Sequence, residues 1–214
     1  MTSLLILGAG GHAKVLAETA ISQGRFSRIA FLDDHAAHEI DHQTVLGWPV
    51  LGPLKRIIEP QIFQSFDAAL VGIGDATTRL HWLKQLIEVG YDCPYLIHPT
   101  ACVSPSASLG SGSVVFSQAV VQAQASIGSG VILNTGCSVD HGVQLANGVH
   151  VCPGSHLAGD VQVGARTWIG IGASVIQQVR IGSDVIVGAG AAVVSDLPVG
   201  ITAVGVPARI INKS

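Results

Sequence analysis

The chain has 214 residues, enough for one large domain or two small ones. Charged residues make up 12% of it and aromatic residues 5%, and the net charge of −3 argues against nucleic acid, whose phosphates require a basic face. No apolar run approaches the roughly 18 residues of a membrane span, and the start MTSLLILGAGGHAK lacks the basic region of a signal peptide. Its four cysteines form no CxxC pair. We therefore expect a cytoplasmic protein with reduced thiols and no membrane partner.

The first part of the chain alternates predicted strands with predicted helices. The apolar run LLIL leads into a glycine turn and a helical stretch. A second strand, RIAFL, ends in Asp33 and Asp34, and a third, AALV, runs into the loop that holds Gly74 and Asp75. Strands that alternate with helices form parallel sheets. We predict a small α/β, Rossmann-like domain over residues 1–95.

The turn after the first predicted strand carries a phosphate-binding pattern. Residues 8–13, GAGGHA, satisfy G-x-G-x-x-[GA] between a strand and a helix. The glycines let the backbone approach a phosphate, and the helix N-terminus favours its charge. Asp33 and Asp34 lie where a ribose-binding carboxylate is expected. The domain is about half the length of a dinucleotide fold, so one nucleotide suits it better than NAD. The alternative is a tight turn that binds nothing.

The rest of the chain has a period of six. Every sixth residue from Ile97 to Val199 is Ile, Leu or Val, and the residue four places later is usually small or Val. Glycine repeatedly follows the periodic position, at Gly110, Gly128, Gly164, Gly170, Gly182 and Gly188. One strand and one turn per six residues make a triangular coil of about 18 residues, and coils stack at roughly 4.8 Å. We predict an all-β domain over residues 96–214 that forms a parallel β-helix, with these glycines in the corner conformations.

Two histidines stand in an otherwise aliphatic part of the repeat. His141 lies two residues after an interior position and falls at a corner, while His150 precedes Val151 and points outward. Neither is expected in the core. Eighteen residues on, His141 stacks on Gly159 and His150 on Trp168, so that a ligand atom can approach His141 above the glycine. Metal needs three or four converging ligands, and we predict no metal site. A neutral imidazole can take a proton from an attacking amine or hydroxyl, as acyl transfer from a thioester requires.

The whole pattern resembles the NeuD/PglD-like sugar acetyltransferases of bacterial surface-glycan synthesis, which are left-handed β-helix acyltransferases with hexapeptide repeats. The motifs that carry the resemblance are GAGGHAK, FLDD, GIGDATTR, NTGCSVDHGVQL, PGSHLAGDVQVG, WIGIGASV and VGVPARII. The similarity covers nearly the whole chain. It implies a homotrimer, with acetyl-CoA in the groove between neighbouring β-helices.

The resemblance also implies roles for individual residues. His141 matches the catalytic histidine, and Asn134 in the same motif is expected to help position it. The residues that match the acetyl-CoA site are His150, Gly159, Ile171 and Ala189. The residues expected to hold the nucleotide of an amino-sugar donor are Gly10, Gly11, His12, Asp33, Asp34, Gly74 and Asp75. The family commonly places a carboxylate directly after the catalytic histidine, where this chain has Gly142. Asp140, on the other side, is the candidate replacement.

The leading hypothesis is an acetyl-CoA-dependent N-acetyltransferase that acts on a nucleotide-linked amino sugar, with a 4-amino-4,6-dideoxy sugar as the expected substrate. O-acetylation of a sialic-acid-type sugar is the alternative within the same class. An NAD-dependent oxidoreductase follows from the glycine loop alone and gives the β-helix no role. A β-helix scaffold that binds a nucleotide sugar without catalysis would tolerate the loss of both histidines. The sequence does not choose among UDP, GDP and dTDP.

Overall fold

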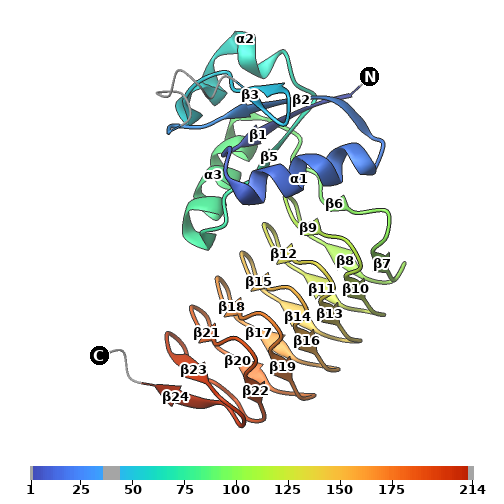
Figure 1. Cartoon of the computed structure of the whole chain (residues 1–214), viewed down its shortest axis with the longest axis vertical. Helices are drawn as coiled ribbons and strands as arrows, with labels where there is room; N and C mark the ends of the chain where they lie inside the picture. The colour runs from blue at the N-terminus through green and yellow to red at the C-terminus, as the bar shows by residue number, and fades with distance from the viewer. Residues whose placement is uncertain (1, 36–43, 212–214) are drawn as a thin grey trace. The chain divides into compact units, whose positions relative to one another are not determined.

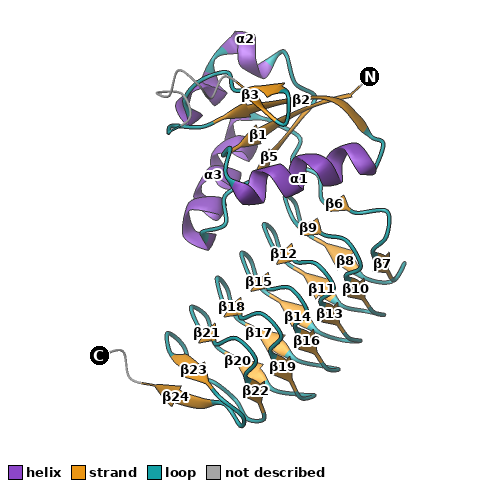
Figure 2. Ribbon diagram, in the orientation of Figure 1, coloured by secondary structure: helices purple, strands orange, loops and turns teal. Residues whose placement is uncertain are grey.

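The structure, a computed structural model, describes residues 2–35 and 44–211. The chain divides into two compact units, residues 1–96 and 97–214 (Figure 1). Helices are drawn only in the first unit, and the described part of the second consists of strands and loops (Figure 2).

The first unit is a small α/β fold built on three parallel strands. Its described elements are β1 (Thr2–Leu7), α1 (Gly11–Ser22), β2 (Phe26–Leu32), β3 (Thr44–Val45), β4 (Trp48–Pro49), the 3-10 helix η2 (Leu54–Ile58), α2 (Pro60–Phe63), β5 (Ala68–Val71) and α3 (Ala76–Val89). The parallel strands lie in the order β2-β1-β5, with β1 fully buried from Leu4 to Leu7. Strands buried on both faces are expected to be continuously aliphatic, as LLIL and AALV are.

The strand order of this sheet places three loops at one edge. β1 lies between β2 and β5, so the chain leaves β1 toward one side and returns on the other. Ligands of open parallel sheets bind outside the carboxyl ends of the strands at such a reversal. The glycine loop after β1, the aspartates after β2 and residues 72–75 after β5 all lie at this edge. The predicted α/β sheet is confirmed.

The second unit is a parallel β-helix. Its strands are β6 (Leu96–Ile97), β7 (Cys102–Val103), β8 (Ser108–Leu109), β9 (Val114–Val115), β10 (Val120–Val121), β11 (Ser126–Ile127), β12 (Ile132–Leu133), β13 (Ser138–Val139), β14 (Gln144–Leu145), β15 (His150–Val151), β16 (His156–Leu157), β17 (Gln162–Val163), β18 (Trp168–Ile169), β19 (Ser174–Val175), β20 (Arg180–Ile181), β21 (Ile186–Val187), β22 (Ala192–Val193), β23 (Thr202–Val204) and β24 (Arg209–Ile211). Each coil stacks on the next in a register of eighteen, as Val139 on Leu157 shows. The predicted hexapeptide β-helix is confirmed.

The strands form three faces. The β13 sheet has the order β22-β19-β16-β13-β10-β7, the β14 sheet β20-β17-β14-β11-β8, and the β15 sheet β24-β23-β21-β18-β15-β12-β9-β6. Two stacks of turns between these faces hold most of the predicted catalytic and acetyl-CoA residues. The His141 corner, between the β13 and β14 sheets, comprises residues 122–124, 140–142, 158–160 and 176–178. The Asn134 corner, between the β15 and β13 sheets, comprises residues 134–136, 152–154, 170–172 and 188–190.

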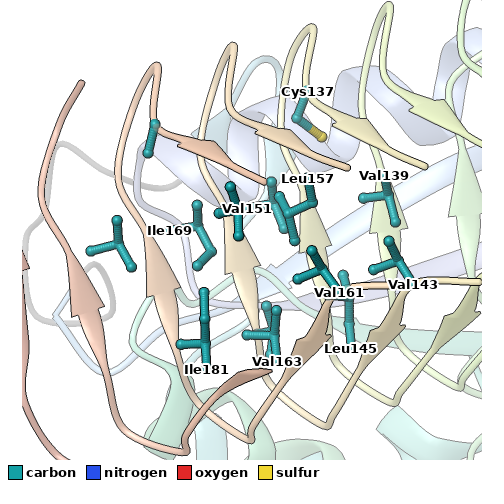
Figure 3. Packing of buried hydrophobic residues seen from close by; sticks show 14 of the residues in the cluster. Cys137, Val139, Val143, Leu145, Val151, Leu157, Val161, Val163, Ile169 and Ile181 are labelled. Carbon is teal, nitrogen blue, oxygen red and sulfur yellow. The ribbon is translucent and has the colours of Figure 1, made fainter. Parts of the chain in front are cut away.

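The interior of the β-helix is filled by the second residue of each strand and by the residue four places later. Val139, Val151 and Val161 have no exposed surface, and Figure 3 shows such side chains gathered inside the coils. Where the later residue is polar, its hydroxyl bonds the backbone of the next coil, as Ser155 Oγ does to the Gly170 carbonyl at 2.7 Å. Close packing of this interior therefore requires aliphatic or small residues at these two positions in every repeat of six.

The glycines that follow the interior positions have a different role from the one predicted. We expected them in corner conformations, but the corner residues with positive φ are others, such as Gly142 at +66° and Asp160 at +60°. A Cβ on Gly164 would lie 2.4 Å from the Ser183 nitrogen, and one on Gly170 would lie 2.5 Å from the Val187 carbonyl oxygen. These glycines are required because the next coil passes too close for a side chain.

The periodic series ends earlier than expected. Val199, the last predicted interior residue, lies in a turn and is 66% exposed. Leu197 takes the interior place and pairs with Ile181, only four residues after Val193, and Ala203 follows in β23. The prediction for Val199 is wrong because the chain turns here into a tail that closes the last coil. That tail ends in β24, which pairs antiparallel with β23.

In the described ranges, no helix combines the length and the apolar character needed to cross a membrane.

Candidate functional site

His141 lies at its corner with the imidazole packed over a glycine. The residue is exposed, and an added Cβ on Gly159 would lie 2.4 Å from its Cε1 and 2.5 Å from its Nε2. The coils are tied together here, because the Asp160 amide donates to the His141 carbonyl at 2.9 Å. The predicted stacking of His141 on Gly159 is therefore present. The glycine provides the room in which the ring rests.

Asp140 holds the backbone of the same turn. Its Oδ1 accepts the His141 amide at 2.7 Å. Asn134 does the same at the other corner, where its Oδ1 accepts the Thr135 amide at 2.8 Å. A short polar side chain that caps the following amide is a common device of turns. The contact that the structure gives the Asp140 carboxylate is thus to the backbone of His141 and not to its ring.

His150 lies in a polar contact on the β15 sheet. Its Nε2 is 3.1 Å from Asn134 Nδ2, and its ring centroid is 4.3 Å from that of Trp168. The side chain points away from the interior of the β-helix as predicted, but it is buried rather than exposed. The bulk of Trp168, one coil along, and the Asn134 amide account for the burial. An amide that donates to Nε2 requires that nitrogen to be unprotonated, with any ring proton on Nδ1.

Ile171 and Ala189 follow one another at the Asn134 corner. The Gly190 amide donates to the Ile171 carbonyl at 2.8 Å, so the two residues lie in adjacent coils. Both are exposed, Ile171 to 57%. Two of the four predicted acetyl-CoA residues thus share one corner, His150 lies on the strand β15 that leads into it, and Gly159 belongs to the other corner.

The predicted catalytic and cofactor residues of one chain consequently fall into two groups. His141, Asp140 and Gly159 lie at the His141 corner, while Asn134 and His150 lie at or beside the Asn134 corner. The expectation that Asn134 positions His141 is not met within one chain, since its amide contacts His150. The two residues belong to one sequence motif, but the strand β13 separates their corners within a chain.

A pocket of about 460 Å³ lies at the carboxyl edge of the α/β sheet. Six of the seven residues predicted to bind the nucleotide line it: Gly10, Gly11, His12, Asp33, Asp34 and Gly74. A Cβ at Gly10 or Gly11 would meet no protein atom, so the backbone here is open to a ligand. Gly10 is the N-cap residue of α1, and no side chain caps this end of the helix. The first amides of a helix lack internal acceptors and attract anions.

The aspartates after β2 shape this pocket in different ways. Asp33 Oδ2 accepts the Ala9 amide and its Oδ1 accepts the His35 amide, both at 2.8 Å. It therefore ties the glycine loop to the end of β2. Asp34 Oδ1 accepts the Leu54 amide at 2.9 Å. Asp75 is not in the lining: its Oδ2 accepts the Thr78 amide at 2.8 Å as the N-cap of α3, which fixes the loop before it.

A buried arginine, which the sequence did not lead us to predict, supports the same loop. Arg79 is 1% exposed, and its guanidinium donates to the carbonyls of Ile73 and Gly74. Burial lowers the pKa of Arg79 to about 10. Burial, with the charge of Arg79 as the smaller cause, lowers the pKa of His12 to about 4. His12 is therefore a neutral side chain in this pocket at pH 7.

Three of the four cysteines, Cys93, Cys137 and Cys152, are buried, and Cys102 is exposed. Burial raises the pKa of both Cys137 and Cys152 to about 12, which leaves their thiols protonated at neutral pH. All four cysteines are free. Among residues 2–35 and 44–211, no group of three or more His, Cys, Asp or Glu side chains is placed to hold a metal ion.

A second hollow, of about 710 Å³, runs along the β14 sheet. Its polar wall is a ladder in steps of eighteen: Ser126, Gln144, Gln162 and Arg180. The tail residues Leu197, Pro198 and Val199 close one end. None of the residues predicted for acetyl-CoA or catalysis lines it. It is larger than the pocket at the α/β sheet, and the β14 sheet that it follows borders the His141 corner.

Comparison with known proteins agrees with this architecture. The PglD N-terminal domain family matches residues 3–86. A curated relative, UDP-N-acetylbacillosamine N-acetyltransferase of Bacillus subtilis, is 38% identical over 119 residues, or 55% of this chain. That match spans 52% of the relative's own length.

Solved structures match over the full length. The acetyltransferase domain of PglB from Neisseria gonorrhoeae is 40% identical, covers 99% of this chain and 100% of its own, and has a TM-score of 0.91. A variant of perosamine N-acetyltransferase from Caulobacter crescentus, solved with CoA and GDP-perosamine, is 38% identical, with coverage of 100% and 98% and a TM-score of 0.93.

A β-helix of hexapeptide coils that follows a small parallel α/β unit is thus the architecture of a class of sugar acetyltransferases. With 40% identity over the whole of a solved relative, the chain belongs to the PglD-like sugar acetyltransferase family.

Proposed function

We propose that the protein is an acetyl-CoA-dependent N-acetyltransferase that acts on a nucleotide-linked amino sugar, expected to be a 4-amino-4,6-dideoxy sugar of bacterial surface-glycan synthesis. The observation that carries the proposal is His141, an exposed imidazole held over Gly159 with no competing side chain at that glycine. Relatives of matching length support it, since two are named as acetyltransferases or their domains and one was solved with CoA and an amino-sugar nucleotide.

The reaction needs a base and an oxyanion donor. The free amine attacks the thioester carbonyl, a C–N bond forms, and the carbonyl electrons move to oxygen. His141 takes the proton that the amine nitrogen loses. When the oxyanion collapses, the C–S bond breaks, and the CoA thiolate leaves and takes up a proton from the imidazolium. The products are the amide and CoA thiol, so every atom is accounted for.

A backbone amide of the Gly159 turn is the donor that we assign to the oxyanion. Ala158 and Asp160 donate their amides to the carbonyls of Val175 and His141. One coil earlier, the amide equivalent to that of Gly159 belongs to His141, and the Asp140 carboxylate accepts it. The residue before Gly159 is Ala158, which has no side-chain acceptor. The Gly159 N–H is therefore the amide that remains, within the described hydrogen bonds of this turn, for developing negative charge.

We assign the nucleotide to the α/β domain, residues 1–95, and acetyl-CoA to the β-helix domain, residues 96–214. The open α1 terminus, with Gly10, Gly11 and Asp34 around it, suits a nucleoside diphosphate. His150, Ile171, Ala189 and Gly159 are assigned to acetyl-CoA. Both ligands belong to the bacterial cytoplasm, and we place the protein there.

We propose that the protein is a homotrimer, because one chain separates His141 from the Asn134–His150 pair. A neighbouring copy that brings its Asn134 corner to the His141 corner would complete the groove. Exposed apolar side chains support such contact on the β15 sheet, where Trp168 is 42% and Ile186 is 44% exposed. Sedimentation at micromolar concentration is the test. A monomer that still turns over would contradict a shared site.

The decisive experiment is thiol release from acetyl-CoA with a panel of nucleotide-linked 4-amino sugars, each on UDP, GDP and dTDP, and with free sialic acid. We expect release with one of the nucleotide-linked amines. Release with sialic acid alone would replace N-acetylation by O-acetylation. Binding of reduced nicotinamide cofactor without thiol release would point to the oxidoreductase, and no release with any acceptor, together with nucleotide-sugar binding, to a scaffold.

A further inference from the structure

Four residues at the His141 corner form a small square. His141 and Gly142 follow one another in one coil, and Gly159 and Asp160 follow one another in the next. Neighbours along the chain are about 3.8 Å apart at Cα, and neighbours between coils about 4.8 Å. The Asp160 amide donates to the His141 carbonyl across the square. Each coil therefore contributes one glycine and one polar side chain.

The two polar side chains lean into the spaces left by the two glycines. The His141 ring occupies the place of a Gly159 side chain, since an added Cβ there would lie 2.4 Å from Cε1. The Asp160 carboxylate occupies the place of a Gly142 side chain, since an added Cβ there would lie 2.2 Å from Oδ1. His141 thus leans toward the coil of Asp160, and Asp160 leans toward the coil of His141.

We propose that Asp160 is the positioning residue of His141, and that its carboxylate takes the place of the acidic side chain that Gly142 lacks. The proposal rests on the function proposed above, because it assigns a partner to the base of that reaction. A carboxylate in this position favours the imidazolium that forms when the amine proton is transferred. It also limits the directions in which the ring can swing away from Gly159.

Asp140 is the competing candidate, and its geometry is less suitable. Its Oδ1 is engaged with the His141 amide, so its main contact is made to the backbone. The adjoining coils of this corner carry Ala123, Gln124, Gln177 and Gln178, which are uncharged. Asp140 and Asp160 are therefore the ionisable groups that the described turns of this corner place around His141.

The first test is Asp160→Asn, which keeps the shape and tolerates the positive φ of the position. We expect kcat to fall about tenfold while the KM of each substrate changes less than about twofold. The matched control is Asp184→Asn. Asp184 also has a positive φ, of 58°, but it pairs with Arg166, and its variant should behave as the wild type.

The second test moves the carboxylate from one coil to the other. Asp160→Gly alone should lose activity as Asp160→Asn does. Adding Gly142→Asp should restore most of kcat, because the new side chain starts in the volume that Asp160 now fills. The comparison of Asp160→Gly with the double variant also tests the role of Asp160 if Asp160→Asn fails to fold. A structural defect at position 160 would not be repaired from position 142.

Other outcomes separate this inference from the proposed function. If His141→Ala loses activity but Asp160→Asn keeps kcat, Asp160 is no partner of His141 and the acetyltransferase proposal stands. If the double variant stays as slow as Asp160→Gly, the inference is likewise overturned. If His141→Ala is fully active, the proposed function fails and this inference fails with it.

Discussion

The two histidines of the β-helix are nine residues apart and lie in opposite surroundings. His141 is exposed at a turn, where its ring rests on a glycine. His150 is buried on a strand, between the Asn134 amide and the Trp168 ring. The difference comes from the position eighteen residues on, which is glycine for one and tryptophan for the other. In a β-helix, the next coil decides what a side chain can do.

The largest effect is expected from His141→Ala. Loss of a general base costs roughly 10²–10⁴ in rate, and we expect about 10²–10³ here because an amine is already a good nucleophile. The loss should fall on kcat, with both KM values little changed, since the ring acts mainly as the proton leaves. Steady-state kinetics with the correct sugar measure this. If His141→Ala kept the wild-type kcat while His150→Ala were inactive, His150 would be the base and His141 the acetyl-CoA contact.

Gly159→Val should remove the resting place of His141 without removing the fold. Its Cβ would collide with the ring, while the equivalent position one coil on is Gln177, so this turn accepts a side chain. We expect a loss of kcat of about ten- to a hundredfold and little change in melting temperature. Gln177→Val is the control for a branched side chain in the turn. A fully active Gly159→Val variant would place the acetyl group elsewhere.

Asp33→Ala extends the comparison to the other unit. Its carboxylate joins the glycine loop to β2 through the Ala9 amide, so its loss should disorder the nucleotide pocket. We expect the KM of the sugar nucleotide to rise about tenfold, equivalent to about 1.4 kcal/mol, and that of acetyl-CoA to change less than about twofold. The measurement is kinetics with each substrate varied in turn. Equal rises in both would argue against separate sites for the two ligands.

His150→Ala should weaken acetyl-CoA and leave the chemistry intact. The ring fixes the Asn134 amide and supports Trp168, so its removal loosens the Asn134 corner. We expect a rise of several-fold in the KM of acetyl-CoA, on the order of 1 kcal/mol, with kcat nearly unchanged. Asn134→Ala, which removes the other half of the contact, should resemble it. An unchanged KM in both variants would remove this corner from the cofactor site.

The smallest effect concerns a third histidine, His12, and is expected in the pH dependence of the free energy of unfolding. The pKa of His12 is lowered to about 4 in the folded protein, from 6.5 in an exposed side chain. Below pH 6.5 the unfolded chain binds the proton and the folded one does not, so stability falls with pH until about pH 4. We expect a loss of about 1 kcal/mol between pH 7.5 and 5.5, absent in His12→Gln. Denaturant unfolding at both pH values measures it, and an equal loss in His12→Gln would assign the acid sensitivity elsewhere.

Sequence reasoning succeeded where one physical demand repeats along the chain. The interior series from Ile97 to Val193 is predictable because each coil must fill the same narrow prism. Val199 was misplaced because the closing tail obeys no period. The burial of His150 was missed, although its neighbour Trp168 was identified, because alternation gives the direction of a side chain and not what covers it. Arg79 gave no signal, since a helical arginine is normally exposed. The lean of Asp160 into the space at Gly142 depends on a rotamer, which spacing does not specify.

The tail that closes the β-helix has a consequence beyond packing. A stack of identical coils is an open template, because its last coil presents unpaired backbone groups to which another chain can add. Here residues 196–211 pair with the last strand of each of the three sheets. Leu197 donates its amide to the Arg180 carbonyl, Ala192 to Gly205, and β24 runs antiparallel beside β23. A strand of reversed direction cannot nucleate another parallel coil, so the tail ends the growth of the ladder. Without it, the same regularity that makes the prism stable would favour filaments joined end to end.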